Sequence, residues 1–289
     1  MNRNILQKSA IALAVGLALV AQAQAQRPLN GQSEAIARLA AETGGNAQVA
    51  LHSATGAARF VRLAPSSKFA SQAKAVGSSD AAKQNSSQQF LSNYGSLFGV
   101  KNAASELSTA RAQKDRFGGT HLTHRQVYQG LPVFGAELKT HFDAADNLTV
   151  VNGTFIPDIT VNATPTRTAE QASKIALTLV KADLATTTKT TAKTTTKLTS
   201  AQPTLMIFRE GLAKGMEGAN HLAWEVEVGN RVNVREFVYV DAHTGKVIDR
   251  INGIHEAKNR RAYDGLGIDP APGPNYPASP FWVEGQAFP

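Results

Sequence analysis

The side chains of this sequence that could do chemistry are its seven histidines and a few close carboxylates. A zinc hydrolase of the H-E-x-x-H type needs two imidazoles on one helical face. It also needs a glutamate between them as general base and a third ligand further along the chain. The nearest approach is His255-Glu256-Ala257-Lys258-Asn259, where Asn259 stands at the second ligand position and Glu284 is a distant carboxylate. We therefore predict no metal ligands, no cofactor and no catalytic residues on this chain.

The remaining candidates for catalysis have simpler structural interpretations. His121 and His124 are three residues apart in a predicted strand, so their side chains should point to opposite faces. Glu225 and Glu227 fall on the solvent side of another predicted strand. The sequence contains neither a G-x-S-x-G motif nor a Gly-rich phosphate loop. Zero cysteines exclude thiol chemistry and a disulfide framework.

Charge and hydropathy point to an exported protein. Lys and Arg exceed Asp and Glu by 30 − 22 = 8, but they are scattered, which is typical of a solvated surface and not of a nucleic-acid site. Met1–Gln26 carries a basic start at Arg3 and Lys8, a short apolar run at Ala10–Val20 and small residues at the end. This run is far below the ~20 residues that cross a bilayer. It predicts a signal peptide over residues 1–25, secretion to the periplasm or medium, and no membrane association after cleavage.

The strongest strand signal runs from His124 to Gly153. From Phe134 the pattern alternates strictly, which is the period of a half-buried antiparallel strand. A Gln-Gly-Leu-Pro break precedes it, and a polar loop at Asp143–Asn147 leads into Leu148–Phe155, so three strands should form a meander. The face predicted to be apolar comprises Phe134, Ala136, Leu138, Thr140 and Phe142. The face predicted to be open comprises Gly135, Glu137, Lys139 and His141.

Helices and strands are expected on both sides of this meander. The N-terminal part predicts a helix at Ser33–Glu42, a hairpin at Ala47–Leu63 and a Ser/Ala-rich linker at Ala64–Ser79. A second helix at Asp80–Phe98, capped at Ser79 or Asp80, and a strand at Glu106–Lys114 should follow. After a boundary at Pro157–Pro165, the C-terminal part predicts a helix at Ala169–Leu184 and a mobile Thr/Lys run at Ala185–Ser200. Four strands should follow, at Thr204–Phe208, His221–Val228, Glu236–Asp241 and Lys246–Ile251. The fold class is therefore α+β, with two small domains, each an antiparallel sheet packed by helices.

Two stretches resemble a known family. The residues Q-x-Y-x-G-L-P-V-F-G-A-E, a hairpin and V-N-G resemble the fungalysin/thermolysin propeptide (FTP) module of secreted thermolysin-like zinc endopeptidases. The residues L-x-W-x-V-x-V and V-Y-V-D-A-x-T-G-K-V resemble the PepSY module that follows it in the same prosegments. The resemblance covers about Ser33–Ile251, and the tail looks like the opening residues of the peptidase domain. It assigns 26–160 to the propeptide module, 165–253 to a PepSY-like module with an insertion at 185–200, and 254–289 to the junction and the start of a truncated peptidase domain.

The resemblance implies a prosegment that inhibits a cognate thermolysin-like protease domain and acts as its intramolecular folding chaperone. Two alternatives stay open: a stand-alone secreted protease inhibitor, or a fragment of an active zinc metalloendopeptidase whose catalytic domain lies beyond the C-terminus. Zinc and calcium are expected only on the missing peptidase domain, and this chain is expected not to be an enzyme. The expected processing region is the polar junction that contains Ile254, His255, Lys258, Arg260 and Arg261.

Overall fold

The computed structural model describes residues 29–64, 79–108, 111–187, 197–254, 261–262 and 282–283. The predicted signal peptide, most of the predicted linker and the middle of the Thr/Lys run lie outside these residues. Among the helices that are described, none is long and apolar enough to cross a membrane.

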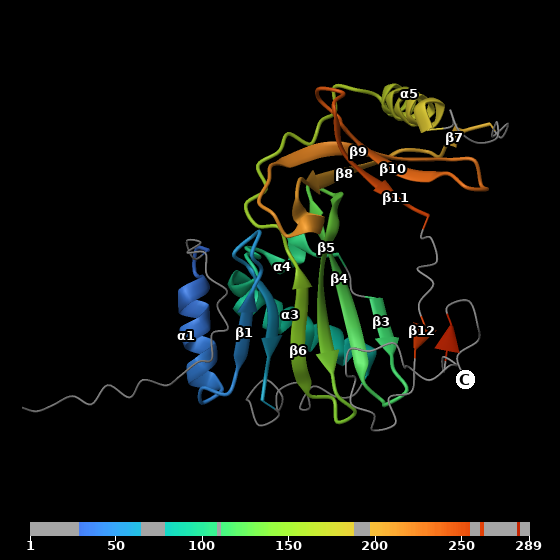
Figure 1. Ribbon diagram of the computed structural model, residues 1–289. Helices are drawn as coiled ribbons and strands as arrows, with labels where there is room; N and C mark the ends of the chain where they lie inside the picture. The colour runs from blue at the N-terminus through green and yellow to red at the C-terminus, as the bar shows by residue number, and fades with distance from the viewer. Residues whose placement is uncertain are drawn as a thin grey trace, which may run out of the picture.

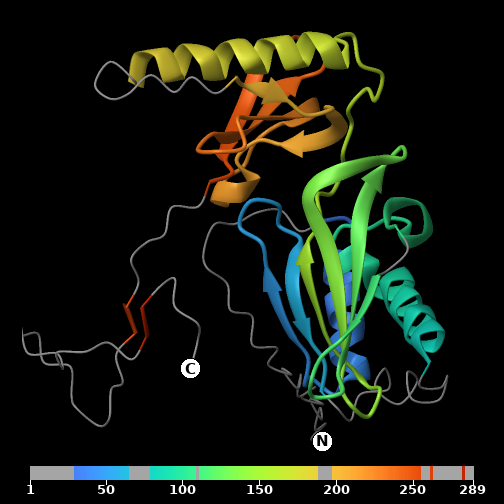
Figure 2. The ribbon, with the colours of Figure 1, turned by 90° about the vertical axis from the view of Figure 1, so that its right-hand side faces the viewer.

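The N-terminal half is a sheet with helices on one face (Figure 2). Its strands, here called the first sheet, run in the order β1-β2-β6-β5-β4-β3, and every neighbouring pair is antiparallel. Its elements are α1 (Gln32–Glu42), β1 (Gln48–Leu51), β2 (Ala58–Arg62), α3 (Asp80–Tyr94), η1 (Gly95–Leu97), α4 (Ala103–Glu106), β3 (Arg111–Lys114), β4 (Thr120–Tyr128), β5 (Leu131–Phe142) and β6 (Leu148–Thr154).

The core of this half lies between the helices and the sheet. Ser79 caps α3 by accepting a hydrogen bond from the Ala82 amide at 3.1 Å, which orients the buried face of the helix. Phe90 and Tyr94 on that face stack with 5.3 Å between ring centroids. They join Leu138 and other alternate strand residues in one cluster, so the predicted meander and its helical cover are confirmed.

One predicted strand begins too early. Glu106, expected to begin the strand, is the last residue of the short helix α4. Asn102 accepts from the Ala104 amide at 3.0 Å, and the Glu106 carboxylate accepts from the Lys101 and Asn102 amides at 2.7 Å each. These caps satisfy amides that a strand would have to pair elsewhere, so the strand starts only at Arg111.

The C-terminal half is a second sheet with α5 along one face (Figure 1). Its strands, here called the second sheet, run in the order β8-β9-β10-β11, with β7 added on β9. The elements are α5 (Ala169–Thr187), β7 (Thr199–Ser200), β8 (Thr204–Arg209), η2 (Leu212–Lys214), β9 (Asn220–Gly229), β10 (Arg235–Asp241) and β11 (Val247–Asn252). Beyond it, β12 (Arg261–Ala262) pairs with β13 (Trp282–Val283).

The helix buries a narrow apolar stripe against the second sheet. Ala172, Ala176 and Val180, at helical spacing, pack on the valines of β9 and β10. The Thr/Lys run, predicted to be mobile throughout, contributes to both neighbours: α5 continues to Thr187 and Thr199–Ser200 forms β7. Leu184, just before the run, and Leu198, near its end, pack against the same core. The α+β class is thus confirmed.

Candidate functional site: the joint between the two sheets

The two sheets meet at an irregular stretch of β5. Residue pairs run regularly from Phe142 down to Glu137, which lies opposite Arg125 of β4; the next pair is Pro132 with Val127. Between these two pairs β4 has only Gln126, whereas β5 has the stretch 133–136. Gly135 in this stretch has φ 66°, a conformation that costs little only for glycine. The extra residues form a bulge that redirects the side chains before it.

The bulge sends Phe134 to the opposite side from Leu138. Leu138 is fully buried under the helices of the first sheet, whereas Phe134 packs in a cluster with β8 and β10 of the second. The Phe134 ring centroid lies 5.2 Å from that of Phe208 and 5.0 Å from that of Tyr239, and Phe208 and Tyr239 stack at 4.3 Å. The prediction that Phe134 shares a face and a core with Leu138 is wrong, because the bulge interrupts the alternation.

The neighbours of Phe134 complete the joint. Val133 pairs in parallel with Ile207 of β8, which makes the two sheets one continuous sheet (Figure 1). Both side chains are buried in a cluster that contains residues of both halves: Val133, Ala136, Ile156, Ile207, Leu222 and Ala242. At the edge, the Arg209 guanidinium donates to the Ala54 carbonyl at 3.2 Å. The halves therefore share a core.

The connection at 157–165, expected to be a boundary between two domains, is held from both ends. The Gln126 side chain makes two 2.8 Å hydrogen bonds with the backbone of Ile156, and the Tyr128 hydroxyl donates to the Val161 carbonyl at 3.0 Å. On the other side, the Trp224 indole donates to the Arg167 carbonyl at 2.8 Å. These bonds give an irregular segment the fixed partners that its pattern did not predict.

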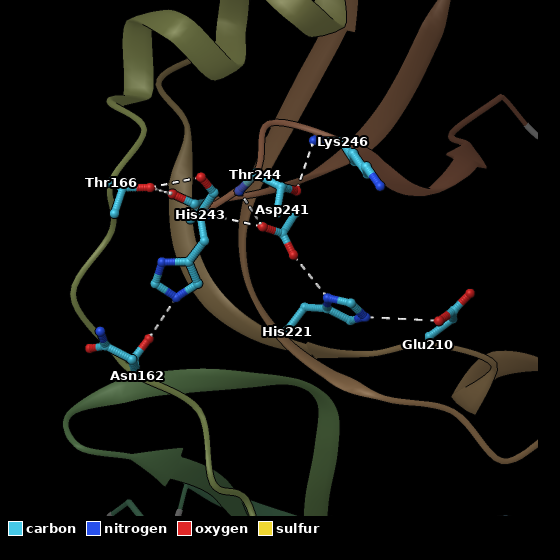
Figure 3. A network of polar contacts seen from close by, with 9 residues as sticks. Asn162, Thr166, Glu210, His221, Asp241, His243, Thr244 and Lys246 are labelled. Atoms are coloured by element: carbon cyan, nitrogen blue, oxygen red, sulfur yellow. Dashed lines mark hydrogen bonds and ion pairs between the residues drawn. The ribbon is translucent and has the colours of Figure 1, made fainter.

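The turn between β10 and β11 supplies a further anchor (Figure 3). The Asp241 carboxylate accepts from loop amides, those of His243 at 2.9 Å and Thr244 at 2.7 Å, and Gly245 has φ 78°. His221 Nδ1 lies 2.9 Å from the same carboxylate. Burial alone would raise the pKa of Asp241, but the hydrogen bonds from Thr244, His221 and His243 outweigh it and hold the pKa below its ordinary value.

The turn between β10 and β11 also binds the segment that connects the two halves. The Thr166 hydroxyl donates to the His243 carbonyl at 2.7 Å, and the Thr166 and Arg167 amides both donate to the Ala242 carbonyl. His243 Nε2 lies 3.0 Å from the Asn162 carbonyl (Figure 3). The Asp241–His221 pair therefore orders the turn that holds this connection.

His124 is the histidine buried most deeply in the first sheet. It is 7% exposed, as expected for the face opposite to half-exposed His121. Its Nε2 lies 2.7 Å from the Ser87 hydroxyl, which in turn lies 2.9 Å from the Thr140 hydroxyl. Burial lowers the pKa of His124 to about 4. A cavity of about 200 Å³ reaches His124, but Ser87 is fully buried, so this serine–histidine contact offers no nucleophile to a substrate. Sequence reasoning missed the pair because its members lie on different elements.

The predicted processing residues lie largely beyond the described chain. Ile254 follows the end of β11, and its amide donates to the Asn252 side chain at 2.8 Å. Arg261 belongs to β12, whereas His255, Lys258 and Arg260 are outside the described residues. In the described segments, no group of three or more His, Asp or Glu side chains converges as a metal site would require.

Family models match a part of each half. The Fungalysin/Thermolysin Propeptide Motif matches residues 105–155, which include the irregular stretch of β5. The Peptidase propeptide and YPEB domain matches residues 168–251, from α5 to β11. This chain carries both propeptide modules of thermolysin-like protease prosegments. The resemblance read from the sequence is thereby confirmed, and the joint lies where the FTP and PepSY modules meet.

Individual relatives agree with the modules. The prosegment-like chain is 33% identical over 162 residues to a thermolysin of Alicyclobacillus acidocaldarius subsp. acidocaldarius, covering 54% of this chain and 27% of that protein. It is 27% identical over 138 residues to a bacillolysin of Brevibacillus brevis, covering 46% of this chain and 24% of that protein. The chain thus spans about a quarter of the length of these relatives. The solved Bacillus megaterium YpeB C-terminal domain aligns with a TM-score of 0.31 and 14% identity, covering 68% of this chain and 72% of that chain.

Proposed function

We propose that the chain is the propeptide region of a secreted thermolysin-like metalloendopeptidase precursor and acts as inhibitor and folding chaperone of the protease domain. The observation that supports it is the shared core of the FTP and PepSY modules, which makes the prosegment a single preformed surface. A preformed surface loses less entropy on binding than two mobile modules would. A chain of propeptide modules that binds a protease needs no catalytic group of its own.

The processing region follows from the same arrangement. The last strand of the second sheet ends at Asn252, and the half-buried Ile254 is two residues further on. We propose that the maturation cut lies within or close to residues 254–262. Cleavage there would free the protease domain while both modules keep their contacts.

The test is an inhibition and refolding assay with the purified chain and a thermolysin-like protease, such as that of Alicyclobacillus. The intact chain should slow peptide hydrolysis and raise the yield of active protease on refolding. New termini formed during incubation should map to residues 254–262. Phe134→Ala serves as the matched variant, since it weakens the joint and leaves the processing region unchanged. If the intact chain neither inhibited the protease nor improved its refolding, the proposal would be rejected. First cuts outside residues 254–262 would reject the proposed junction.

A further inference from the structure

Two histidines face each other on the side of the first sheet that lies opposite to its described helices. His121 of β4 and His141 of β5 are directly paired in the strand register. Their Nδ1 atoms are 2.8 Å apart, and their ring centroids 4.8 Å apart. A separation of 2.8 Å between two nitrogens is that of a hydrogen bond, so a hydrogen has to lie between them.

The outer ring nitrogens determine where that hydrogen can come from. His121 Nε2 lies 3.0 Å from the Asp115 carboxylate, which only accepts, so this nitrogen carries a hydrogen. His141 Nε2 lies 2.8 Å from Asn152 Oδ1, which also only accepts, so it carries one too. If both rings were neutral, each would have its single hydrogen on Nε2, and two lone pairs would face each other across the 2.8 Å gap.

We propose that the His121–His141 pair holds one extra proton in the folded protein, with His121 as an imidazolium and His141 as its neutral acceptor. His121 then donates from Nε2 to Asp115 and from Nδ1 to His141, while His141 donates from Nε2 to Asn152. With the Asn152 amide oxygen facing His141 Nε2, all four ring nitrogens are satisfied in this state. The chain of hydrogen bonds ties the β3–β4 turn, which Asp115 also holds by accepting from the Phe117 and Gly119 amides, to β6.

The charges around the pair favour one proton and disfavour two. Asp115 places a negative charge on the His121 side. On the His141 side, Lys139 lies two residues along the same face of β5, where it pairs with Glu137 at 2.9 Å. Burial first, and then the charges of His121 and Lys139, lower the pKa of His141 despite its bond to Asn152.

Groups on the neighbouring strands do not reverse this balance. Gln113 of β3 lies opposite His121 and is uncharged. Arg62 of β2 lies opposite Val150, which itself lies opposite His141, and adds a positive charge on that side. A second proton would therefore enter an already positive region and would put two donors in contact. The pair makes the first sheet pH-sensitive: alkaline pH removes the shared hydrogen and loosens the contact between β4, β5 and β6.

The first measurement is ¹⁵N-resolved NMR of the imidazoles in the intact chain at pH 7, with His121→Gln and His141→Gln used for assignment. We expect His121 to be protonated on both nitrogens and His141 to be the neutral Nε2–H tautomer. Two neutral rings at pH 7, with the bridging hydrogen belonging to His141, would overturn the proposal. This measurement on the unsubstituted protein does not depend on whether any variant folds.

The second measurement is urea unfolding between pH 6.5 and 8.5. A folded state that holds one proton more than the unfolded chain loses stability as pH rises, with the unfolding constant growing by up to about tenfold per pH unit. His141→Leu removes the acceptor and should flatten this dependence, while His141→Gln keeps an acceptor and should restore part of it. A slope that is equal in the unsubstituted chain and in His141→Leu would show that the pair carries no extra proton.

Discussion

Acid should destabilise the propeptide module through His124. In the unfolded chain this histidine titrates near its ordinary pKa of 6.5, whereas burial lowers the pKa to about 4 in the folded protein. Well above pH 6.5 the group is neutral in both states and contributes nothing to the pH dependence. As pH falls from 6.5 towards 4, the unfolded chain binds a proton at His124 that the folded chain does not bind, so the unfolding free energy falls.

The size of the effect follows from the two values. The gap is about 2.5 pH units, and each is equivalent to about 1.36 kcal/mol, so full protonation of the unfolded chain costs about 2.5 × 1.36 ≈ 3.4 kcal/mol. This is a large part of a typical unfolding free energy of about 5–15 kcal/mol. The cause is the site itself: His124 lies between Ser87 and the sheet with no carboxylate bonded to it, so a charge there has no counter-ion.

The assay is urea unfolding of the unsubstituted chain and of His124→Gln at pH 7, 6, 5 and 4. Gln keeps a neutral polar side chain and cannot titrate. At pH 7 the variant should be somewhat less stable than the unsubstituted chain. On acidification, its unfolding free energy should fall by about 3 kcal/mol less than that of the unsubstituted chain. Comparing the two proteins cancels the contributions of His52, His141 and the carboxylates, which titrate in both. Parallel pH profiles for the two proteins would refute the reasoning.

Four further outcomes are expected. Leu138→Ala should destabilise the first sheet by ~2–5 kcal/mol, because this side chain is fully buried, while Glu137→Ala on the open face should cost far less; equal melting losses would show that the strand register is misassigned. Phe134→Ala should separate a single melting transition into two by removing the aromatic bridge to the second sheet, and an unchanged single transition in calorimetry would count against the joint. Asp241→Ala should destabilise the second sheet, because it leaves the turn amides and His221 without their acceptor; limited proteolysis that spares the turn in this variant would contradict this role. The purified chain should not hydrolyse casein, and chelator-sensitive hydrolysis free of contaminants would disprove this.

The sequence determined the local structure wherever one physical signal was unopposed. Alternation from Ala136 to Phe142 placed four side chains correctly, because period 2 follows from strand geometry alone. The Asp241 turn is equally local, since an Asp side chain accepts from amides of its own turn and a Gly takes positive φ at little cost. The order of the modules also followed from contiguous motifs, each of which lies within one stretch of chain.

Tertiary structure decided what depends on distant partners. Phe134 looked like one more step of the alternation; only Phe208 and Tyr239, on strands far along the chain, show why the bulge at Gly135 turns it away. The His121–His141 contact depends on the register between two strands, which a spacing along one chain does not state. Burial of His124 under α3 likewise arises from packing between elements. Local pattern reports the conformation that a segment prefers, whereas contacts between segments depend on the free energy of the whole fold.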